Sequence, residues 1–477
     1  MRTYLFIFLL LVSNKVWCQS GIQFAAPITV ANGTVYSYAK PKIVLDVNNE
    51  PVVLWGKISS GQIFVSTFNG SGFNTPVQIN PVGTEAYISS FYNADIKSNG
   101  DTMVAVFATD VPANRTYLVK SVDGGNTWSD TIRVDQLTNG EIAYFPSVDL
   151  NEYGKIAVTF MRHDAGWANP RYVIATSLDD GNSFLPDTNA SAVASGEVCD
   201  CCPAEMVYEG DKQVLIFRNN NSNTREFYAS VSNDNGNSYS GLNVDNLGWV
   251  YPACPSVAPS AFISNDSLVT VFMNGVTGVN RLYVSTSSLS GMTNGNLFMV
   301  DSIVPVGTTQ TQPQMAGKDS IMALVWNNTM PGEAEVYFRF SNSGAAGLTG
   351  DGINITNSSG TQQHADIIYA NGVFHIVYQN NPTQEVYYLK AIMDEYISIE
   401  EPSDFEFVLH QNNSIFTLDL LDNTNSYSFY QVFDLLGRSI SNGEINNNRI
   451  EFDMNSNSHG LYWIKMDGSK NIVKFYW

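Results

Sequence analysis

The sequence is poor in charge, and the charge it carries is mostly negative. Only 14% of its 477 residues are Asp, Glu, Lys or Arg, and 24 basic residues stand against 45 acidic ones, for a formal net charge of −21. Nucleic-acid binding needs a net basic face, so this balance argues against a nucleic-acid partner.

Long apolar runs are also scarce. One such run, Tyr4–Val12, follows Arg2 and precedes a polar stretch that ends at Cys18. Nine apolar residues are too few to cross a bilayer, so the pattern predicts a signal peptide over residues 1–18. A lipid attached to Cys18 is the alternative, although Trp17 is bulky where such sites favour a small residue. No other segment is apolar enough for a membrane helix, and we expect a soluble mature chain.

Aromatic residues, by contrast, are abundant at 12%, and they recur in a long-period pattern. Seven segments of alternating apolar residues, 52 to 57 residues apart, each begin a unit of strand, polar turn and second strand: PKIVLDV, NADIKSN, FPSVDLN, CPAEMVY, APSAFIS, QPQMAGK and HADIIYA. The second strand of each unit ends on an aromatic residue: Trp55, Phe107, Phe160, Phe217, Phe272, Trp326 and Tyr378. Repeats of about 50 residues with four short strands each predict an all-β propeller over residues 19–396. Seven blades is the expected number, and six is the alternative.

The last repeat has no obvious fourth strand. The N-terminal stretch FAAPITVA resembles the fourth strands FNTPVQIN and WSDTIRVD of other repeats. We therefore expect it to complete the final blade and close the ring.

Three turns that follow third strands share the pattern Ser-x-Asp-x-Gly-x-(Ser/Thr)-aromatic. They contain Ser121, Asp123, Gly125, Thr127 and Trp128; Ser177, Asp179, Gly181, Ser183 and Phe184; and Ser232, Asp234, Gly236, Ser238 and Tyr239. The pattern resembles the Asp box of sialidase-like (BNR) propellers. The residue types suit a structural role, because Asp can accept backbone N–H bonds, Gly permits positive φ and the aromatic ring packs between strands. In a four-stranded meander these turns lie at the end opposite the loops that join strands 2–3 and successive blades.

The tail, residues 397–477, departs from the repeat. Its stretch from Val432 to Arg438, and Gly460-Leu461-Tyr462 followed by alternating residues, resemble the C-terminal sorting domain of type IX secretion cargo in Bacteroidetes. The resemblance implies a small β-sandwich, export across the outer membrane with the type IX machinery as partner, and a secreted or surface-attached product. A β-sandwich binding module is the alternative.

Arginines gather in the loops of the predicted ligand face. They are Arg115, Arg162, Arg171, Arg218, Arg225 and Arg281. Guanidinium groups suit carboxylate or sulfate, so we expect an anionic ligand there. Arg115, Arg171, Arg225 and Arg281 recur at one position of the repeat, which favours a repeated ion pair for these four.

Arg162 and Arg218 break the repeat and are the better ligand candidates. Acidic and aromatic residues near them suit glycan chemistry. The full candidate set is Arg162, His163, Asp164, Trp167, Glu205, Arg218 and Arg225, with Glu197 and Asp200 nearby.

The sialidase resemblance implies an arginine triad, a tyrosine nucleophile assisted by Glu and an Asp acid. Its first arginine sits in an Arg-Ile-Pro motif, but the corresponding stretch here contains Lys40 and Lys42 and no arginine. No Tyr/Glu pair is recognisable by motif, so the catalytic residues are unassigned. An enzyme on this scaffold would be a glycoside hydrolase of sialidase type.

Four cysteines remain after removal of the signal peptide: Cys199, Cys201, Cys202 and Cys254. In an oxidising compartment they most simply form two disulfides, and three connectivities exist. The alternatives are a copper or zinc site, with His163 as a further ligand, and a redox or free-thiol role. No other cofactor is expected.

These observations leave three functional hypotheses. The first is an exported, monomeric propeller that binds, and in one version hydrolyses, an anionic glycan or glycoprotein. The second is a scaffold or adhesin. The third is a metal or redox site at the cysteines.

Overall fold

A computed structural model describes residues 21–476 except 33–39, 112–113, 139, 302–304, 306, 331–332, 394–406, 413, 421–426, 435–437, 458–460 and 468–471. Its regular structure in that part of the chain is strand, apart from two short 3₁₀ helices, η1 (Ala190–Val193) and η2 (Ala345–Leu348). The all-β prediction is confirmed. None of the described helices is long and apolar enough to span a membrane. The predicted signal peptide, residues 1–18, lies outside the described residues.

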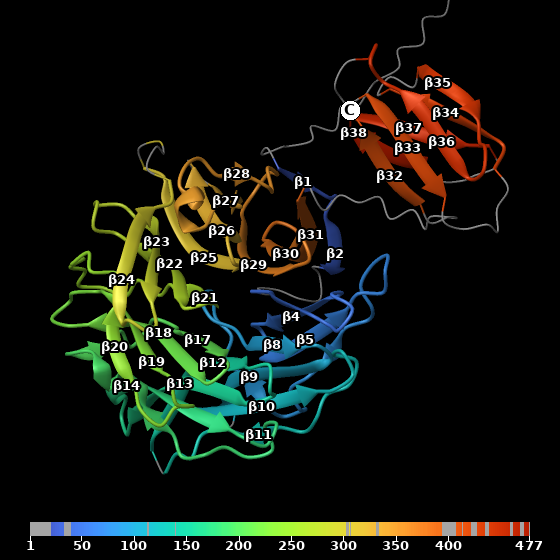
Figure 1. The fold of residues 1–477 in the computed structure, drawn as a ribbon. Coiled ribbons are helices and arrows are strands. Elements are labelled where there is room, and N and C mark those ends of the chain that lie inside the picture. Colours follow the sequence, from blue (N-terminus) through green and yellow to red (C-terminus); the bar gives the residue numbers. More distant parts are fainter. Residues whose placement is uncertain are drawn as a thin grey trace, which may run out of the picture. The chain divides into compact units, whose positions relative to one another are not determined.

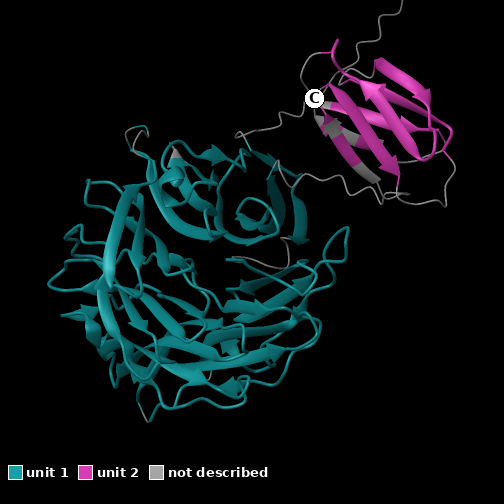
Figure 2. Cartoon of the chain, in the orientation of Figure 1, with its two compact units in different colours: residues 1–396 teal, residues 397–477 magenta. Residues whose placement is uncertain are grey.

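The chain divides into two compact units, Met1–Tyr396 and Ile397–Trp477 (Figure 2). The described strands of the first unit form seven antiparallel sheets around a common centre, as a β-propeller requires (Figure 1). Each sheet corresponds to one sequence repeat.

The first four sheets contain β3 (Lys42–Leu45), β4 (Pro51–Lys57), β5 (Gln62–Thr67) and β6 (Val77–Gln78); β7 (Glu85–Ala86), β8 (Asp95–Asn99), β9 (Thr102–Val111), β10 (Arg115–Ser121) and β11 (Ile132–Arg133); β12 (Ile142–Leu150), β13 (Ile156–Asp164), β14 (Ala168–Ser177) and β15 (Thr188–Asn189); and β16 (Glu197–Val198), β17 (Glu205–Glu209), β18 (Lys212–Asn220), β19 (Phe227–Ser232) and β20 (Ser240–Asn243).

The other three contain β21 (Ser260–Ser264), β22 (Ser267–Asn274), β23 (Arg281–Ser288) and β24 (Thr293–Met299); β25 (Thr309–Lys318), β26 (Ile321–Met330), β27 (Glu333–Ser341) and β28 (Ile353–Asn354); and β29 (Gln362–Ala370), β30 (Val373–Asn380) and β31 (Glu385–Met393) with β1 (Ile22–Phe24) and β2 (Ile28–Ala31).

The ring is closed by the N-terminal strands. Both β1 and β2 pair antiparallel with β31, with Ile22 opposite Met393 and Ile28 opposite Tyr388. The prediction that FAAPITVA completes the last sheet is therefore confirmed.

The hydrophobic core of this unit lies between neighbouring sheets. All seven aromatic residues that end the second strands are buried, and each packs into a cluster shared with the preceding sheet. Phe107 of β9, for example, packs against Leu54 and Val65 of the first sheet. Burying one such side chain stabilises the fold by about 2–3 kcal/mol, so the ring is held together by the spaces between its sheets.

The second unit is a β-sandwich. One sheet contains β32 (Phe407–Asn412), β33 (Ile415–Leu420) and β36 (Arg449–Asp453), and the other contains β34 (Phe429–Phe433), β35 (Ser439–Glu444), β37 (Leu461–Met466) and β38 (Ile472–Tyr476). Phe416 and Phe452 of the first sheet share one core with Val432, Ile464 and Phe475 of the second.

Candidate functional site

The two ends of the ring carry different kinds of residue. The three Asp-box turns lie beside the turns between first and second strands, since Gly124 N donates to Asp101 O at 3.1 Å and Asn235 N donates to Asp211 O at 3.1 Å. The cysteines precede the first strands β17 and β21, and Cys199 N donates to Arg218 O at the far end of β18, at 2.9 Å. Boxes and cysteines therefore occupy opposite ends.

The three boxes share one hydrogen-bond pattern. In the first, Ser121 Oγ donates to Asp123 Oδ1 at 2.8 Å and accepts from Gly125 N at 2.9 Å, while Asp123 accepts from Thr127 N at 2.9 Å and Thr127 Oγ1 at 2.6 Å. The boxes of Asp179 and Asp234 repeat these contacts. The aromatic residues Trp128, Phe184 and Tyr239 pack at the edges of the clusters between sheets. The side chains of each box thus form hydrogen bonds within their own turn, which supports a structural role for the boxes.

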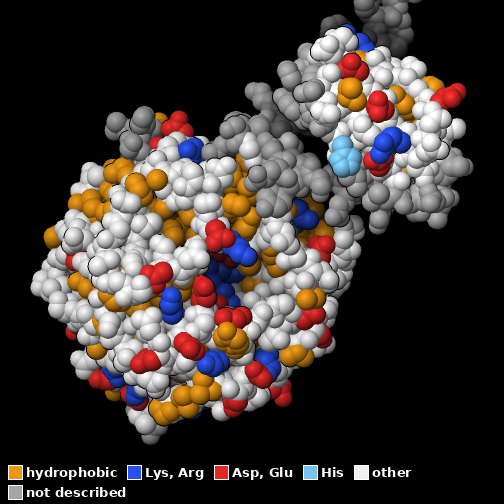
Figure 3. Space-filling view, in the orientation of Figure 1, with side chains coloured by type: hydrophobic (Ala, Val, Ile, Leu, Met, Phe, Trp, Pro, Cys, Tyr) orange, Lys and Arg blue, Asp and Glu red, His pale blue; other side chains and the backbone are white. Residues whose placement is uncertain are grey.

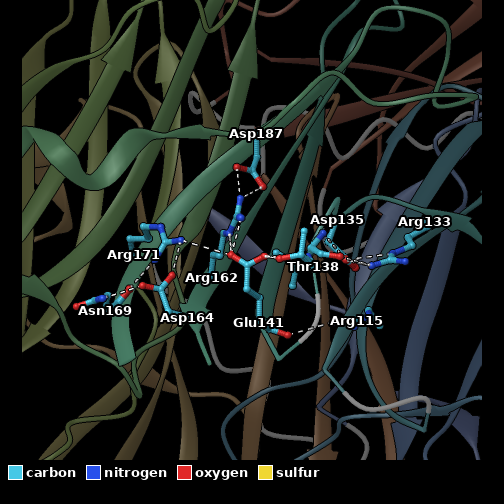
Figure 4. Close-up of polar contacts among 11 residues, drawn as sticks. Arg115, Arg133, Asp135, Thr138, Glu141, Arg162, Asp164, Asn169, Arg171 and Asp187 are labelled. Carbon is cyan, nitrogen blue, oxygen red and sulfur yellow. Dashed lines mark hydrogen bonds and ion pairs between the residues drawn. The ribbon is translucent and has the colours of Figure 1, made fainter. Parts of the chain in front are cut away.

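Arg162 lies in a closed network of charges at the other end (Figure 4). Its guanidinium donates to Glu141 Oε1 at 2.6 Å and to Asp187 Oδ1 at 2.8 Å. The hydrogen bonds from Arg162 lower the pKa of Glu141 to about 2. Two carboxylates already occupy this arginine, so an anionic ligand would have to displace one of them.

Asp164 is likewise engaged. Arg171 Nη2 lies 2.9 Å from Asp164 Oδ1, and Asn169 Nδ2 donates to Asp164 Oδ2 at 2.7 Å. Arg171 therefore forms the ion pair that the sequence predicted for its repeat position.

The other three arginines at that position correct this prediction, because they bind backbone carbonyls instead. Arg115 donates to Glu141 O at 3.1 Å, Arg281 to Thr308 O at 2.6 Å and Arg225 to Tyr251 O at 3.1 Å. Each carbonyl belongs to a loop that leads to the next sheet, so these arginines fasten the interblade loops. Arg225, predicted as a ligand candidate, is only 6% exposed.

Arg218 is the clearest correction to the candidate set. Its side chain is fully buried, with the guanidinium carbon 4.1 Å from the centre of the Phe227 ring and 5.4 Å from that of Trp249. It donates to Met273 O at 2.8 Å. A ligand at the surface cannot reach it without displacing these rings.

His163 and Trp167 lie together near the tip of the hairpin β13–β14. Their rings are 5.2 Å apart; His163 is 2% exposed, and burial lowers its pKa. The described residues whose ligand atoms lie close enough to hold a metal jointly are the cysteines and Asp200, and His163 is not among them. Trp167 is 54% exposed and remains available for stacking.

A polar ring around the central axis was not recognised from the sequence. In each repeat, one residue of the first strand pairs with the second-strand residue that directly precedes the buried aromatic. This first-strand residue is polar in all seven repeats. These residues, here called the axial ring, are Lys42, Asp95, Ser147, Glu205, Ser260, Gln314 and Asp366. They line two cavities of about 70 and 280 Å³ at the centre of the ring. Figure 3 shows charged side chains deep in the hollow there.

Most charges of the axial ring are paired. Lys42 Nζ lies 3.6 Å from Asp366 Oδ1, and Lys97 Nζ, from the next layer, lies 3.2 Å from Glu205 Oε1. Asp95 accepts from Ser147 Oγ at 2.8 Å and from Val148 N at 3.1 Å. Glu205 thus belongs to the axis rather than to the Arg162 network, and burial raises its pKa.

Lys40 differs from these cations. It lines the smaller cavity with His364, Phe91 and Tyr92. Among the described residues its ammonium has no carboxylate or hydrogen-bond partner, and burial, with repulsion from Lys42, lowers its pKa to about 7. His364 Nδ1 is buried there without a hydrogen-bond partner in the described part of the chain.

An aromatic strip connects this cavity to Trp167. Ring centres are 6.0 Å apart between Tyr92 and Tyr87, 4.5 Å between Tyr87 and Tyr144, and 5.4 Å between Tyr144 and Trp167. The smaller cavity therefore combines a cation that no described residue pairs with and a wall of rings that reaches the surface.

Fold and site together define a seven-sheet propeller followed by a β-sandwich. Residues 412–475 match the family model of the secretion system C-terminal sorting domain. The tail is thus a sorting domain, and the protein is exported to the cell surface or released, as the sequence predicted.

Solved structures of similar fold include a protein of unknown function from Dyadobacter fermentans, with 14% identity, a TM-score of 0.45 and coverage of 78% of this chain and 99% of that one. An ulvan lyase matches with 10% identity, a TM-score of 0.49 and coverage of 78% and 95%. A leech intramolecular trans-sialidase matches with 11% identity, a TM-score of 0.43 and coverage of 72% and 82%. No curated protein matches the chain.

Proposed function

We propose that this exported propeller binds an anionic glycan at the mouth of the axial cavity. The observation that carries the proposal is Lys40, a cation without a carboxylate partner among the described residues, at a cavity walled by Phe91 and Tyr92. Nearby cations such as Lys42 and Arg162 are already paired. A carboxylate or sulfate group on a sugar is the complement that Lys40 lacks.

The aromatic strip supports a sugar rather than a bare ion as the ligand. Rings with a polar tip, such as Tyr87 and Tyr144, offer an apolar face and a hydroxyl together. With Trp167 exposed at the end of the strip, an oligosaccharide could place its acid group at Lys40 and stack neighbouring units along the rings.

Hydrolysis is a separate step that the proposal does not require. Asp95, Glu205 and Asp366 line the cavity, and each is held by a lysine or by N–H and O–H donors. Glu205 is the carboxyl group best suited to act as an acid, since burial raises its pKa. Release of free sugar from a bound glycan would distinguish a hydrolase from a lectin-like protein.

Calorimetric titration with sialylated, uronic-acid and sulfated oligosaccharides tests the proposal. At pH 6 the Lys40 ammonium is present, and Lys40→Gln should weaken binding about tenfold or more, the usual worth of a charge-assisted hydrogen bond. Because the pKa of Lys40 is about 7, affinity should fall as the pH rises through 7. Lys40→Arg should retain binding at pH 9, since a guanidinium stays protonated.

Lys318→Gln is the matched control. Lys318 is exposed at the turn between β25 and β26, at the end of the ring that carries the boxes, so its loss should leave affinity unchanged. Equal binding by wild type and Lys40→Gln would refute the assigned contact. No binding at millimolar glycan would instead favour the scaffold hypothesis.

A further inference from the structure

The four cysteines form one cluster that holds a disulfide and two thiols. Cys201 and Cys254 are disulfide-bonded, whereas Cys199 and Cys202 are free and buried, so the prediction of two disulfides was wrong. The Cys199 Sγ lies 3.6 Å from the Cys201 Sγ. Cys202 N donates to Cys199 O at 3.1 Å, so a tight turn holds a thiol in contact with a disulfide sulfur.

Buried positive charge surrounds this thiol. Arg218 and Arg225 are 0% and 6% exposed, and Arg218 Nε and Arg225 Nη1 have no hydrogen-bond partner in the described part of the chain. A hydrogen bond from the Cys202 thiol, together with the charges of Arg218 and Arg225, lowers the pKa of Cys199 to about 7. The buried Tyr172 phenol also faces the cluster.

A thiolate at Cys199 would satisfy two features at once. It would add negative charge beside the guanidinium groups of Arg218, which also interacts with Asp245, and Arg225, and it is the form of cysteine that attacks a disulfide. The two ends of the disulfide differ in a way that gives the attack a direction. Cys199 touches Cys201, whereas Cys254 is exposed on the loop that precedes β21.

We propose that this cluster is a thiol–disulfide exchange centre, with Cys199 as the nucleophile and Cys254 as the leaving group. The Cys199 thiolate forms a bond to Cys201 Sγ as the Cys201–Cys254 bond breaks, and the electron pair leaves on Cys254 Sγ. The proton lost by Cys199 passes to solvent, and Cys254 can take one up. No electrons enter or leave, and the number of thiols is unchanged.

The exchange moves a thiol from the interior to the surface. The product is a Cys254 thiolate beside the ligand face, able to react with small-molecule disulfides and other soft electrophiles. This activity does not depend on the proposed glycan site, since none of the four cysteines lines the axial cavity.

Labelling of the folded full chain with excess N-ethylmaleimide, followed by peptide mapping, tests the proposal. Wild type should be labelled at Cys254 although the structure places this residue in a disulfide. Cys199→Ser should reduce labelling of Cys254 at least about tenfold, because the internal nucleophile is lost. Lys318→Gln, at the exposed turn between β25 and β26 and at the opposite end of the ring, is the control and should retain labelling, since Cys199, Cys201, Cys254 and the hydrogen bond from Cys202 all remain.

The rate of labelling gives a second criterion that needs no variant. If exchange is the slow step, the rate becomes independent of reagent concentration, and it should rise about tenfold from pH 6 to pH 8 as Cys199 ionises. Three results would each overturn the proposal: an unlabelled Cys254 in wild type, equal labelling in Cys199→Ser, or a bound zinc or copper ion with four titratable thiols.

Discussion

At the scale of the residue, the neighbours of an arginine decide whether a ligand can use it. Arg162 and Arg218 break the sequence repeat in the same way, yet Arg162 lies between two carboxylates and Arg218 lies between two aromatic rings. Lys40 stands where the sialidase resemblance would place an arginine, and among the described residues its ammonium has no carboxylate or hydrogen-bond partner. Residue type indicated which chemistry was available, and only the contacts showed which groups were free to perform it.

Substitution of Arg218 tests this distinction. Arg218→Met should lower the free energy of unfolding by about 2–4 kcal/mol, because the ring contacts and the bond to Met273 O are lost from a buried site. Arg218→Lys should recover only part of this, since an ammonium cannot stack as a planar guanidinium does. Denaturant unfolding measures both, with exposed Lys318→Met as the control.

An unfolding curve for Arg218→Met that overlays that of the wild type would show that the buried contacts contribute little. Weaker glycan binding by a fully stable variant would return Arg218 to the ligand site.

At the scale of the element, the sequence was sufficient for the strands and insufficient for the site. Alternation between turns predicted the strands, and the likeness of residues 24–31 to other fourth strands predicted the closure. The axial ring escaped prediction because its members are about 50 residues apart and meet only when all seven sheets surround one axis. Each member of the ring lies in a first strand and directly follows a Pro or an Ala. Without the fold, nothing about this position indicates that it faces a common axis.

The cysteines show the same limit in a smaller form. Spacing allowed Cys254 to pair with any of Cys199, Cys201 and Cys202. The turn that bonds Cys202 N to Cys199 O leaves Cys201 as the one bonded to Cys254. The pairing partner of Cys254 thus depends on local backbone geometry, which cannot be read from sequence spacing.

The closing strand gives the element-scale prediction. Ile22 of β1 is fully buried against Phe338 and Phe374 of the last two sheets. Ile22→Ala should lower the free energy of unfolding by about 2–4 kcal/mol through the cavity it leaves. Gln23→Ala, at an exposed position of the same strand, should change it by less than about 0.5 kcal/mol. Equal effects of the two variants in thermal unfolding would contradict a structural role for β1.

At the scale of the whole molecule, the chain combines a ring with a separate sandwich that carries the export signal. Each unit has its own core, since the cluster around Phe416 and Phe475 contains residues of the tail alone. Stability and destination therefore reside in different parts of the chain.

Truncation after Tyr396 separates the two. In a bacterium with type IX secretion machinery, the truncated chain should stay in the periplasm, while a reporter fused ahead of residues 397–477 should reach the cell surface or the medium. Thermal unfolding of the purified ring should be unchanged by the truncation. Export of the truncated chain, or a lowered unfolding temperature, would show that the units are not independent.

The pairing of β1 with β31 also imposes an order on biogenesis. A chain that crosses a membrane from its N-terminus delivers Ile22 first and Met393 last, so the final sheet waits until almost the whole ring has emerged. During that interval β1 and β2 wait without their partner strand β31, and unpaired strand edges are the kind of surface on which foreign strands add and chains aggregate. Pairing β1 with β31 closes the longest loop in the unit and so costs the most conformational entropy. We therefore expect closure of the ring to limit the folding rate. The time that β31 takes to emerge therefore sets how long the ring stays open and prone to aggregation.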